Sequence, residues 1–168
     1  MLPLHQPDDT IGRLKEICDF YRPTELLLLG DIVHRALPLP EIQAELERLL
    51  AELPRARLIA GNHDRFLEKL IPTPLQTEHT CGGYLFVHGH VTSKTPERIV
   101  MGHEHPAISV GDGVATSVKC PCFLVSRSVI VLPAFSFWAA GGDEMALSQR
   151  FAQAVAILGD KLLPIRLK

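Results

Sequence analysis

Long hydrophobic runs and a strong charge of either sign are both missing from this 168-residue sequence. No stretch approaches the roughly 20 apolar residues that a membrane-spanning helix needs, so we expect no membrane contact. The formal net charge is only −2, with 17 Lys and Arg against 19 Asp and Glu. This balance excludes a broad electrostatic attraction to nucleic acid or to an anionic membrane surface. A nucleic-acid substrate would therefore have to be held locally, close to an active centre.

The sequence also lacks a recognisable leader and paired cysteines. Its first residues, MLPLHQPDDT, resemble neither a signal peptide nor a transit peptide, so the expected location is the cytoplasm. None of the four cysteines belongs to a Cys-x-x-Cys pair. Cys120 and Cys122 lie two residues apart in an apolar run, so in a β-strand they would share one face. We expect two reduced, buried thiols there rather than a disulfide or a zinc site.

Hydrophobic residues make up 46% of the sequence, which is enough for a substantial core. The length predicts a single domain over residues 1–168. Apolar residues recur at helical spacing in three segments, which have polar or charged residues between them. These segments predict helices over 10–21, 39–53 and 144–158, the third ending at Gly159.

Short continuous apolar runs predict the β-strands, beginning with 25–31 and the start of 57–64. With the helix between them, these two strands form a strand–helix–strand unit of a parallel sheet. After a Pro-rich loop over 71–80, the second half is expected to be β-rich, with an antiparallel or mixed sheet. Its predicted strands are 84–89, 98–103, 107–110, 114–118, 122–126, 129–133 and an edge strand within 161–168.

Four of the predicted strands end in residues that can bind a metal ion. These residues are Asp31 after LLLLG, Asn62 and His63 after RLIAG, His88 after YLFV, and His103 and His105 after IVMG. The carboxyl ends of parallel strands collect ligands at one edge of a sheet, so these side chains can converge. Each residue alone is better explained as a capping or loop residue. Glycine beside the polar residue in GDIVH, GNHD, VHGH and GHEH permits tight turns, and four such coincidences are hard to obtain from packing alone.

The donor types indicate the metal and its chemistry. Imidazole nitrogens with carboxylate and amide oxygens, and without thiolate, suit Mn, Fe, Zn, Ni or Co. A carboxylate can bridge two such ions, and paired ions assist in-line attack at phosphorus by polarising phosphoryl oxygens and activating water. The leaving alkoxide then needs a proton, which a histidine held by a carboxylate can supply. His63 followed by Asp64 has that composition.

The motifs GDIVH, GNHD, VHGH and GHEH resemble those of the calcineurin-like metallophosphoesterases, whose signature runs D-x-H, GD, GNH[DE], H, GHxH. Within that superfamily the sequence looks most like the ligase-associated DNA damage response endonucleases or phosphoesterases. His34 in GDIVH, the segment GHEHP, and the stretches CPCFL and VLPAFSFWAAGG support this closer resemblance, which covers about residues 1–142. It implies a four-layer α/β/β/α sandwich and a nuclease or phosphodiesterase that hydrolyses phosphodiester bonds in DNA repair.

The resemblance also implies a set of metal ligands. Asp31 would bridge two divalent ions, with manganese as the expected metal. Asn62, His88 and His103 would complete one position, and His105 would belong to the other.

The same resemblance implies that His63 is the general acid and a phosphate contact, and that Asp64 orients it. His34 and His90 receive no certain role. Each either contacts a ligand or the substrate, or is a supporting or solvated histidine.

One family motif, D-x-H on the first strand, is missing from the sequence, so the expected sandwich lacks its first strand. His5 cannot replace the motif, because no aspartate lies two positions before it. Asp31 and His105 would then be the remaining ligands of one position, and we expect one well-occupied ion and one weak or empty position. Unpaired backbone edges beside the absent strand predict a homodimer, or another segment that fills the gap. A natural short form, a truncation and a misassigned start all fit these expectations.

Two other functions stay open on this evidence. A catalytically impaired member could serve as a binding or interaction module, because the D-x-H motif is missing. A phosphomonoesterase acting on a nucleotide or a small metabolite is the second, since no residue fixes the substrate size. Trp138 and Phe137 could stack a base, although core packing is the better explanation for Phe137.

Overall fold

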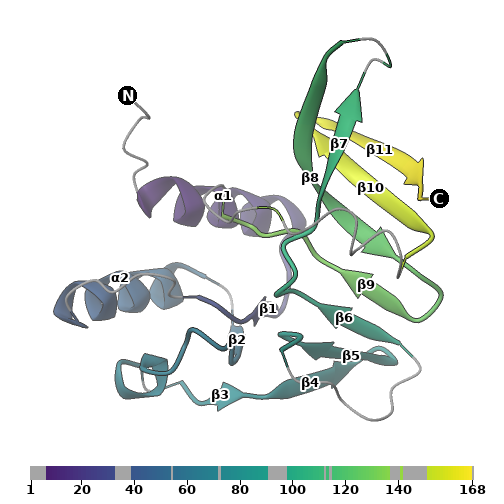
Figure 1. Ribbon diagram of the computed structural model, residues 1–168. Coiled ribbons are helices and arrows are strands. Elements are labelled where there is room, and N and C mark those ends of the chain that lie inside the picture. Colours follow the sequence, from purple (N-terminus) through teal and green to yellow (C-terminus); the bar gives the residue numbers. More distant parts are fainter. Residues whose placement is uncertain are drawn as a thin grey trace. The chain divides into compact units, whose positions relative to one another are not determined.

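The computed structural model describes residues 7–32, 39–53, 55–71, 73–90, 98–111, 113, 115–136, 141 and 151–167. The chain divides into two compact units, Met1–Gln76 and Thr77–Lys168. Each unit has its own β-sheet (Figure 1). No helix in the described ranges is long and apolar enough to cross a membrane.

The first unit combines two α-helices with a small parallel sheet of order β1-β2-β3. Its elements are α1 (Pro7–Tyr21), β1 (Leu26–Leu29), α2 (Leu39–Glu52), β2 (Ala56–Ile59), the 3-10 helix η1 (Leu67–Lys69) and β3 (Leu75–Gln76). The parallel pairing of β1 with β2, in which Leu26 lies opposite Ala56, confirms the predicted strand–helix–strand unit. Leu46 of α2 is buried in one cluster with Leu58 of β2 and Leu67 of η1. This packing fixes the end of β2, from which the GNHD motif follows.

The second unit contains a mixed sheet of order β11-β10-β8-β9-β6-β5-β4, with β7 paired to β8. Its strands are β4 (Glu78–Cys81), β5 (Tyr84–Val87), β6 (Ile99–Met101), β7 (Ala107–Gly111), β8 (Ser117–Val125), β9 (Val129–Val131), β10 (Gln153–Leu158) and β11 (Lys161–Arg166). β5, β6 and β9 are parallel neighbours, whereas the other pairs are antiparallel. The prediction of a β-rich, mixed second half is confirmed. β11, which contains Pro164, lies at the end of the sheet order, as predicted for an edge strand.

The cysteines behave as the composition predicts. Cys120 and Cys122 on β8 are 5% and 1% exposed and belong to the core cluster of the second unit, together with Leu124 and Val131. All four cysteines are free thiols. Burial, and to a smaller extent the nearby Asp19 carboxylate, raise the pKa of the Cys18 thiol in α1.

The predicted helix over 144–158 is wrong in its C-terminal part, because residues 153–158 form strand β10. Residues 144–150 lie outside the described ranges. Burial alternates along β10, where Ala154 and Ala156 are fully buried against β8 and its neighbours. Alanine is a good helix former, but intrinsic propensity is small compared with tertiary interactions, and pairing with β8 and β11 on both sides outweighs it. Gly159, predicted to stop a helix, instead occupies the turn into β11 with a φ of 60°.

Two other predicted boundaries change. The separate strands expected over 114–118 and 122–126 form one strand, β8, which continues through Pro121. β8 pairs with β7 along its first half and with β9 and β10 along its second. We expected the chain to break between two strands at this point, but the strand continues and only its pairing partner changes. The expected Pro-rich loop over 71–80 also contains β3 and most of β4, because each finds a neighbouring strand to pair with.

Candidate metal centre

Asp31 follows β1 in the first unit and is held against the GNHD motif that follows β2. The backbone N–H of His63 donates a hydrogen bond to Oδ1 of Asp31 at 3.1 Å. The Asp31 side chain is half-buried, as is Asn62, whereas His63 is exposed. The parallel pairing of β1 and β2 brings these two strand ends together, as predicted for adjacent strands. We call Asp31 and Asn62 the first half-site, because they supply one carboxylate and one amide oxygen.

Asp64 is buried, with 3% of its surface exposed, and its carboxylate binds two backbone amides. Oδ1 accepts from the N–H of Ile32, and Oδ2 accepts from the N–H of Gly61, both at 2.9 Å. Ile32 directly follows Asp31, and Gly61 directly precedes Asn62. One carboxylate therefore clamps the two loops that carry the first half-site. The predicted role of Asp64 in orienting His63 is tested by neither bond and stays a prediction.

Replacement of Asp64 by asparagine should lower the free energy of unfolding by about 1.5–3 kcal/mol, because one buried amide loses its charged acceptor. Urea unfolding of the metal-free protein measures this effect. Asp160→Asn is the matched control, since Asp160 is exposed in the β10–β11 turn and should change stability by less than about 0.5 kcal/mol. Equal free energies of unfolding for Asp64→Asn and Asp160→Asn would contradict the stabilising role of the two hydrogen bonds that Asp64 accepts.

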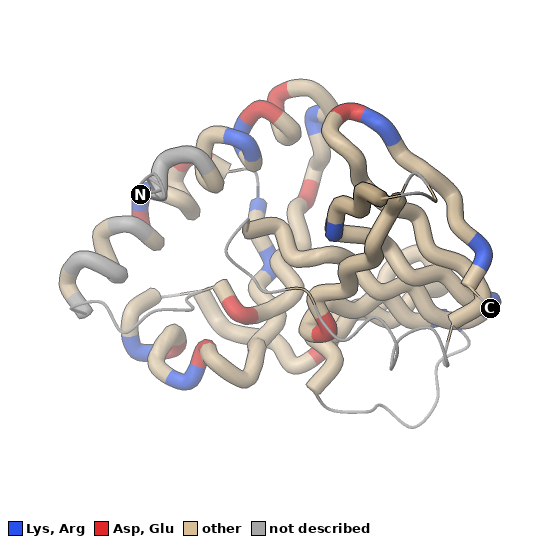
Figure 2. The backbone as a smooth tube through the Cα atoms, turned by 45° about the horizontal axis from the view of Figure 1, so that its top comes forward, with Lys and Arg blue, Asp and Glu red and all other residues tan. Residues whose placement is uncertain are grey.

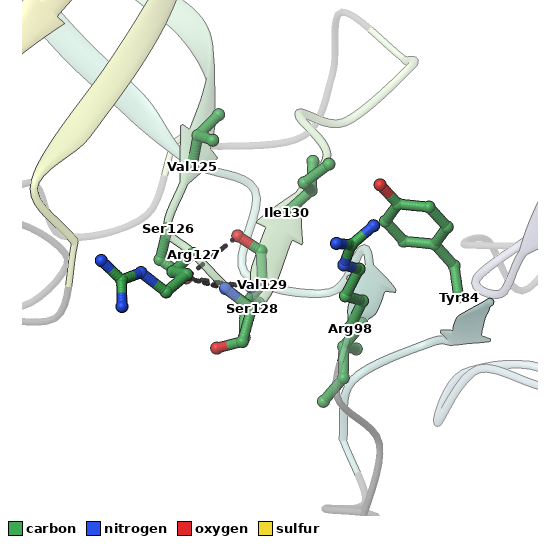
Figure 3. Close-up of a pocket in the computed structure, with 9 residues that line it drawn as sticks. Tyr84, Arg98, Val125, Ser126, Arg127, Ser128, Val129 and Ile130 are labelled. Atoms are coloured by element: carbon green, nitrogen blue, oxygen red, sulfur yellow. Dashed lines mark hydrogen bonds between the residues drawn. The ribbon is translucent and has the colours of Figure 1, made fainter.

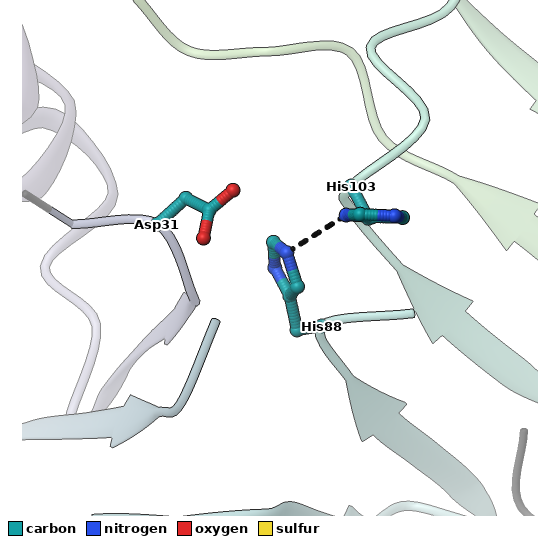
Figure 4. Close-up of side chains that lie close together, drawn as sticks. All are labelled: Asp31, His88 and His103. Atoms are coloured by element: carbon teal, nitrogen blue, oxygen red, sulfur yellow. Dashed lines mark hydrogen bonds between the residues drawn. The ribbon is translucent and has the colours of Figure 1, made fainter. Parts of the chain in front are cut away.

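His88 and His103 meet in the second unit, at the carboxyl ends of the adjacent parallel strands β5 and β6. His88 is only 2% exposed. Nδ1 of His103 and Nε2 of His88 lie 3.1 Å apart and share a hydrogen bond, and the ring centroids are 4.9 Å apart. Figure 4 draws these two side chains with their hydrogen bond, and also Asp31 of the first unit. We call His88, His103 and His105 the second half-site.

The loops that carry these histidines are tied together through the backbone. The N–H of Gly102 donates to the carbonyl of His88 at 3.0 Å, and the N–H of Glu104 donates to the carbonyl of Gly102 at 2.8 Å. Gly89 has a φ of 119°, and a Cβ at this position would lie 2.6 Å from Cε of Met101 and 3.3 Å from Cβ of His103. The backbone conformation therefore favours glycine in VHGH, and a side chain there would also crowd His103 of the GHEH loop.

Backbone strain is concentrated on residues of the two half-sites. Among the described residues, four other than glycine have a positive φ, and three of them are Asp31, His103 and His105, at 51°, 65° and 44°. The left-handed conformation costs a non-glycine residue about 1 kcal/mol or more, and such strain clusters at functional sites. The fourth, Arg22, directly follows α1, where this conformation commonly ends a helix.

Within the second half-site, the His88–His103 pair fits a metal ion by its chemistry and its spacing. The hydrogen bond between His88 and His103 uses one ring proton, and loss of that proton would leave two imidazole nitrogens 3.1 Å apart. At this spacing both nitrogens can contact one ion at the usual metal–nitrogen distance of about 2.1 Å. The first half-site, taken by itself, offers a carboxylate and an amide group, whose oxygens divalent transition metals also accept as donors.

The remaining sequence candidates take different positions. His90 is exposed, and its ring centroid lies 5.3 Å from that of His88 and 6.2 Å from that of His103. His105 is half-buried. His5, His34, Phe137 and Trp138 lie outside the described residues. Sequence reasoning missed the amide clamp of Asp64 and the positive φ of Asp31, His103 and His105, since neither has a signature in residue type or spacing.

The comparisons with known proteins agree with this picture. The family model of calcineurin-like phosphoesterases matches residues 4–120, which is more than half of the chain. Among solved structures, the chain is similar to the crystal structure of the nuclease MPE of Pseudomonas putida, with a TM-score of 0.70 and 21% sequence identity. That match covers 94% of this chain and 79% of the other. The comparison with curated proteins found no match.

At 21% identity the structural match establishes the fold, and it confirms the predicted α/β fold of the metallophosphoesterases. The motifs that suggested this family, from GDIVH to GHEH, all lie inside the matched segment. The chain belongs to the calcineurin-like phosphoesterase family, whose members are metal-dependent hydrolases of phosphate esters.

Proposed function

We propose that the protein is a metal-dependent phosphodiesterase that cleaves nucleic acid, and that its two half-sites act together within one domain. The observation that chiefly supports the proposal is the His88–His103 pair. Its two ring nitrogens are spaced for a shared ion, in a chain that belongs to a phosphoesterase family. Asp31, Asn62, His88 and His103 would hold one ion, and His105 with Asp31 would contact a second.

The protein's own groups have distinct tasks in this proposal. A bound divalent ion, with Mn²⁺ as our candidate, would polarise the phosphoryl oxygens and lower the pKa of a coordinated water. His63 is exposed, and its backbone is hydrogen-bonded to Asp31, so its ring can reach a substrate beside the first half-site. We assign to His63 the donation of a proton to the leaving alkoxide. Asp64 holds the backbone on which His63 and Asp31 are placed.

Two observations favour a phosphodiester substrate over a small phosphomonoester. The similar solved structure is that of a nuclease, and the motifs resemble those of DNA damage response endonucleases. We extend the proposal to DNA as the substrate, in repair. Association into a homodimer through sheet edges stays a prediction, which light scattering of the purified protein can test.

Hydrolysis of bis-p-nitrophenyl phosphate tests the proposal directly. The purified protein should release p-nitrophenolate when Mn²⁺ is present, and EDTA should abolish the reaction. His88→Ala should lose both metal binding, measured by calorimetry, and activity, because it removes a buried donor. Preference for p-nitrophenyl phosphate over the diester would favour the phosphomonoesterase alternative. A folded protein that is inactive with every divalent ion would favour a binding module and would overturn the proposed function.

A further inference from the structure

A pocket with both polar and apolar lining residues lies in the second unit, away from His88 and His103. It has a volume of about 290 Å³, close to the lower end of the range for small-ligand sites. It is lined by Tyr84, Arg98, Ile99, Val125, Ser126, Arg127, Ser128, Val129 and Ile130 (Figure 3). These residues come from the starts of β5, β6 and β9 and from the turn between β8 and β9.

The pocket and the second half-site occupy opposite ends of the same strands. Tyr84 begins β5, which His88 directly follows, and Arg98 directly precedes β6, after which His103 lies. A strand of four residues spans about 13 Å, so a ligand in the pocket would not contact the metal ligands. The pocket is therefore a separate site, and its occupancy does not depend on the proposed function.

The charged groups of the pocket are all positive. Arg98 places its guanidinium carbon 5.6 Å from the centroid of the Tyr84 ring, an arrangement visible in Figure 3. This cation–π contact restricts the Arg98 side chain beside the ring. Arg127 is exposed on the turn. Among the described residues, neither arginine pairs with a carboxylate. Over its full sequence the unit is nearly balanced, with eight Lys or Arg against seven Asp or Glu, so the positive character belongs to the pocket and not to the unit. Figure 2 marks the charged residues along the described backbone.

The turn between β8 and β9 gives the pocket a firm polar rim. The N–H of Val129 donates to Oγ of Ser126 at 2.9 Å, and the N–H of Ser128 donates to the same oxygen at 3.4 Å. The Ser126 hydroxyl donates to the carbonyl of Val129 at 3.2 Å. These hydrogen bonds hold the backbone of the turn that carries Arg127 and Ser128. The Cα atoms of both residues are therefore held in place at the rim of the pocket.

We propose that this pocket binds a phosphate group, either of a free nucleotide or phosphate ion or of a nucleic-acid backbone. Guanidinium groups recognise phosphate through paired N–H donors, and hydroxyls and a tyrosine add neutral donors. A phosphate group has more acceptor oxygens than a carboxylate and can therefore accept from more of the donors that line the pocket. The site would hold a substrate or an effector at a distance from the metal centre.

Titration of the ¹⁵N-labelled protein, followed by NMR, tests the site. Inorganic phosphate and a hydrolysis-resistant phosphorothioate hexathymidylate are the two probes. Either or both should shift the amide resonances of Ser126, Arg127 and Ser128 in a saturable way. Arg98→Gln should weaken this binding about tenfold, since it removes a charge-assisted contact. Saturation by inorganic phosphate would assign the site to isolated phosphate groups, and saturation by hexathymidylate alone would assign it to a nucleic-acid backbone.

Three further variants keep the result interpretable. Lys161→Gln, which removes an exposed cation on β11, should leave the binding unchanged. Arg127→Gln should also weaken phosphate binding. It takes the place of Arg98→Gln in the test if that variant fails to fold. His88→Ala should retain the shifts at the turn, which separates this site from the metal centre. Shifts that Arg98→Gln leaves unaltered, shifts confined to the neighbours of His88 and His103, or no shift with either probe would overturn the proposal.

Discussion

Replacement of His63 by alanine is expected to lower kcat about 10²–10⁴-fold on a dinucleotide while metal affinity stays within about twofold. We take the donors of the first half-site from Asp31 and Asn62, and the backbone N–H of His63 donates a hydrogen bond to Asp31. That hydrogen bond survives the substitution, so Asp31 should keep its place. The side chain is exposed and can be removed without opening a cavity in the core. Steady-state kinetics and calorimetric titration with Mn²⁺ measure the two quantities.

The leaving group provides the sharpest test of the acid role of His63. An alkoxide needs protonation as it departs, whereas p-nitrophenolate departs readily without it, so the loss should be much smaller for bis-p-nitrophenyl phosphate. His79→Ala is the matched control, because His79 lies in β4, outside both half-sites. It should leave the kinetics of both substrates unchanged. Equal losses on the two substrates would show that His63 acts by binding phosphate rather than by donating a proton.

Replacement of Gly61 by alanine is the second substitution with a large expected effect. A Cβ on Gly61 would lie 2.2 Å from both the backbone nitrogen and Oδ1 of Asp31. The backbone of β1 and its loop cannot yield easily, because Asp64 clamps this loop to Gly61 itself. We expect the free energy of unfolding to fall by about 1–3 kcal/mol, as for other overpacked sites. Displacement of Asp31 should also weaken Mn²⁺ binding by about 10–100-fold.

Gly12→Ala is the control for Gly61→Ala. Gly12 lies inside α1, and a Cβ there would meet no atom within 4 Å. The substitution should raise the free energy of unfolding by about 0.5–1 kcal/mol, since alanine is the better helix former. Urea unfolding and calorimetry on both variants give the comparison. A Gly61→Ala protein as stable as the parent, with unchanged metal affinity, would show that the contact between the two loops is not needed.

Local sequence patterns were sufficient to predict a helix or strand wherever one hydrophobic periodicity dominated the segment. Helix α2 follows the predicted range closely, because its apolar stripe faces one cluster around Leu46 and Leu58. Strands β1 and β2 were predictable from continuous apolar runs, since parallel strands are usually buried on both faces. The positions of Asp31, Asn62, His88 and His103 after strands follow from these same patterns, and their family motifs identified the chemistry.

Residues 153–158 show where local patterns fail. QAVAIL has apolar residues that fit both a helical stripe and an alternating strand, and the spacing alone favoured the wrong one. Pairing with β8 on one side and with β11 on the other decided the outcome, and both partners lie outside the segment. The same dependence on partners merged two predicted strands into β8.

By itself, the sequence determined the family, the α/β class and the residues with metal-binding chemistry, because these depend on residue types and their spacing along the chain. Only the tertiary structure decided that Asp64 clamps two loops, that Gly61 must lack a side chain, and that three proposed ligands adopt a positive φ. It also placed Arg98 over Tyr84 beside a polar turn. Each of these features depends on contacts between segments that are distant in sequence, and such contacts form only when the strands have paired.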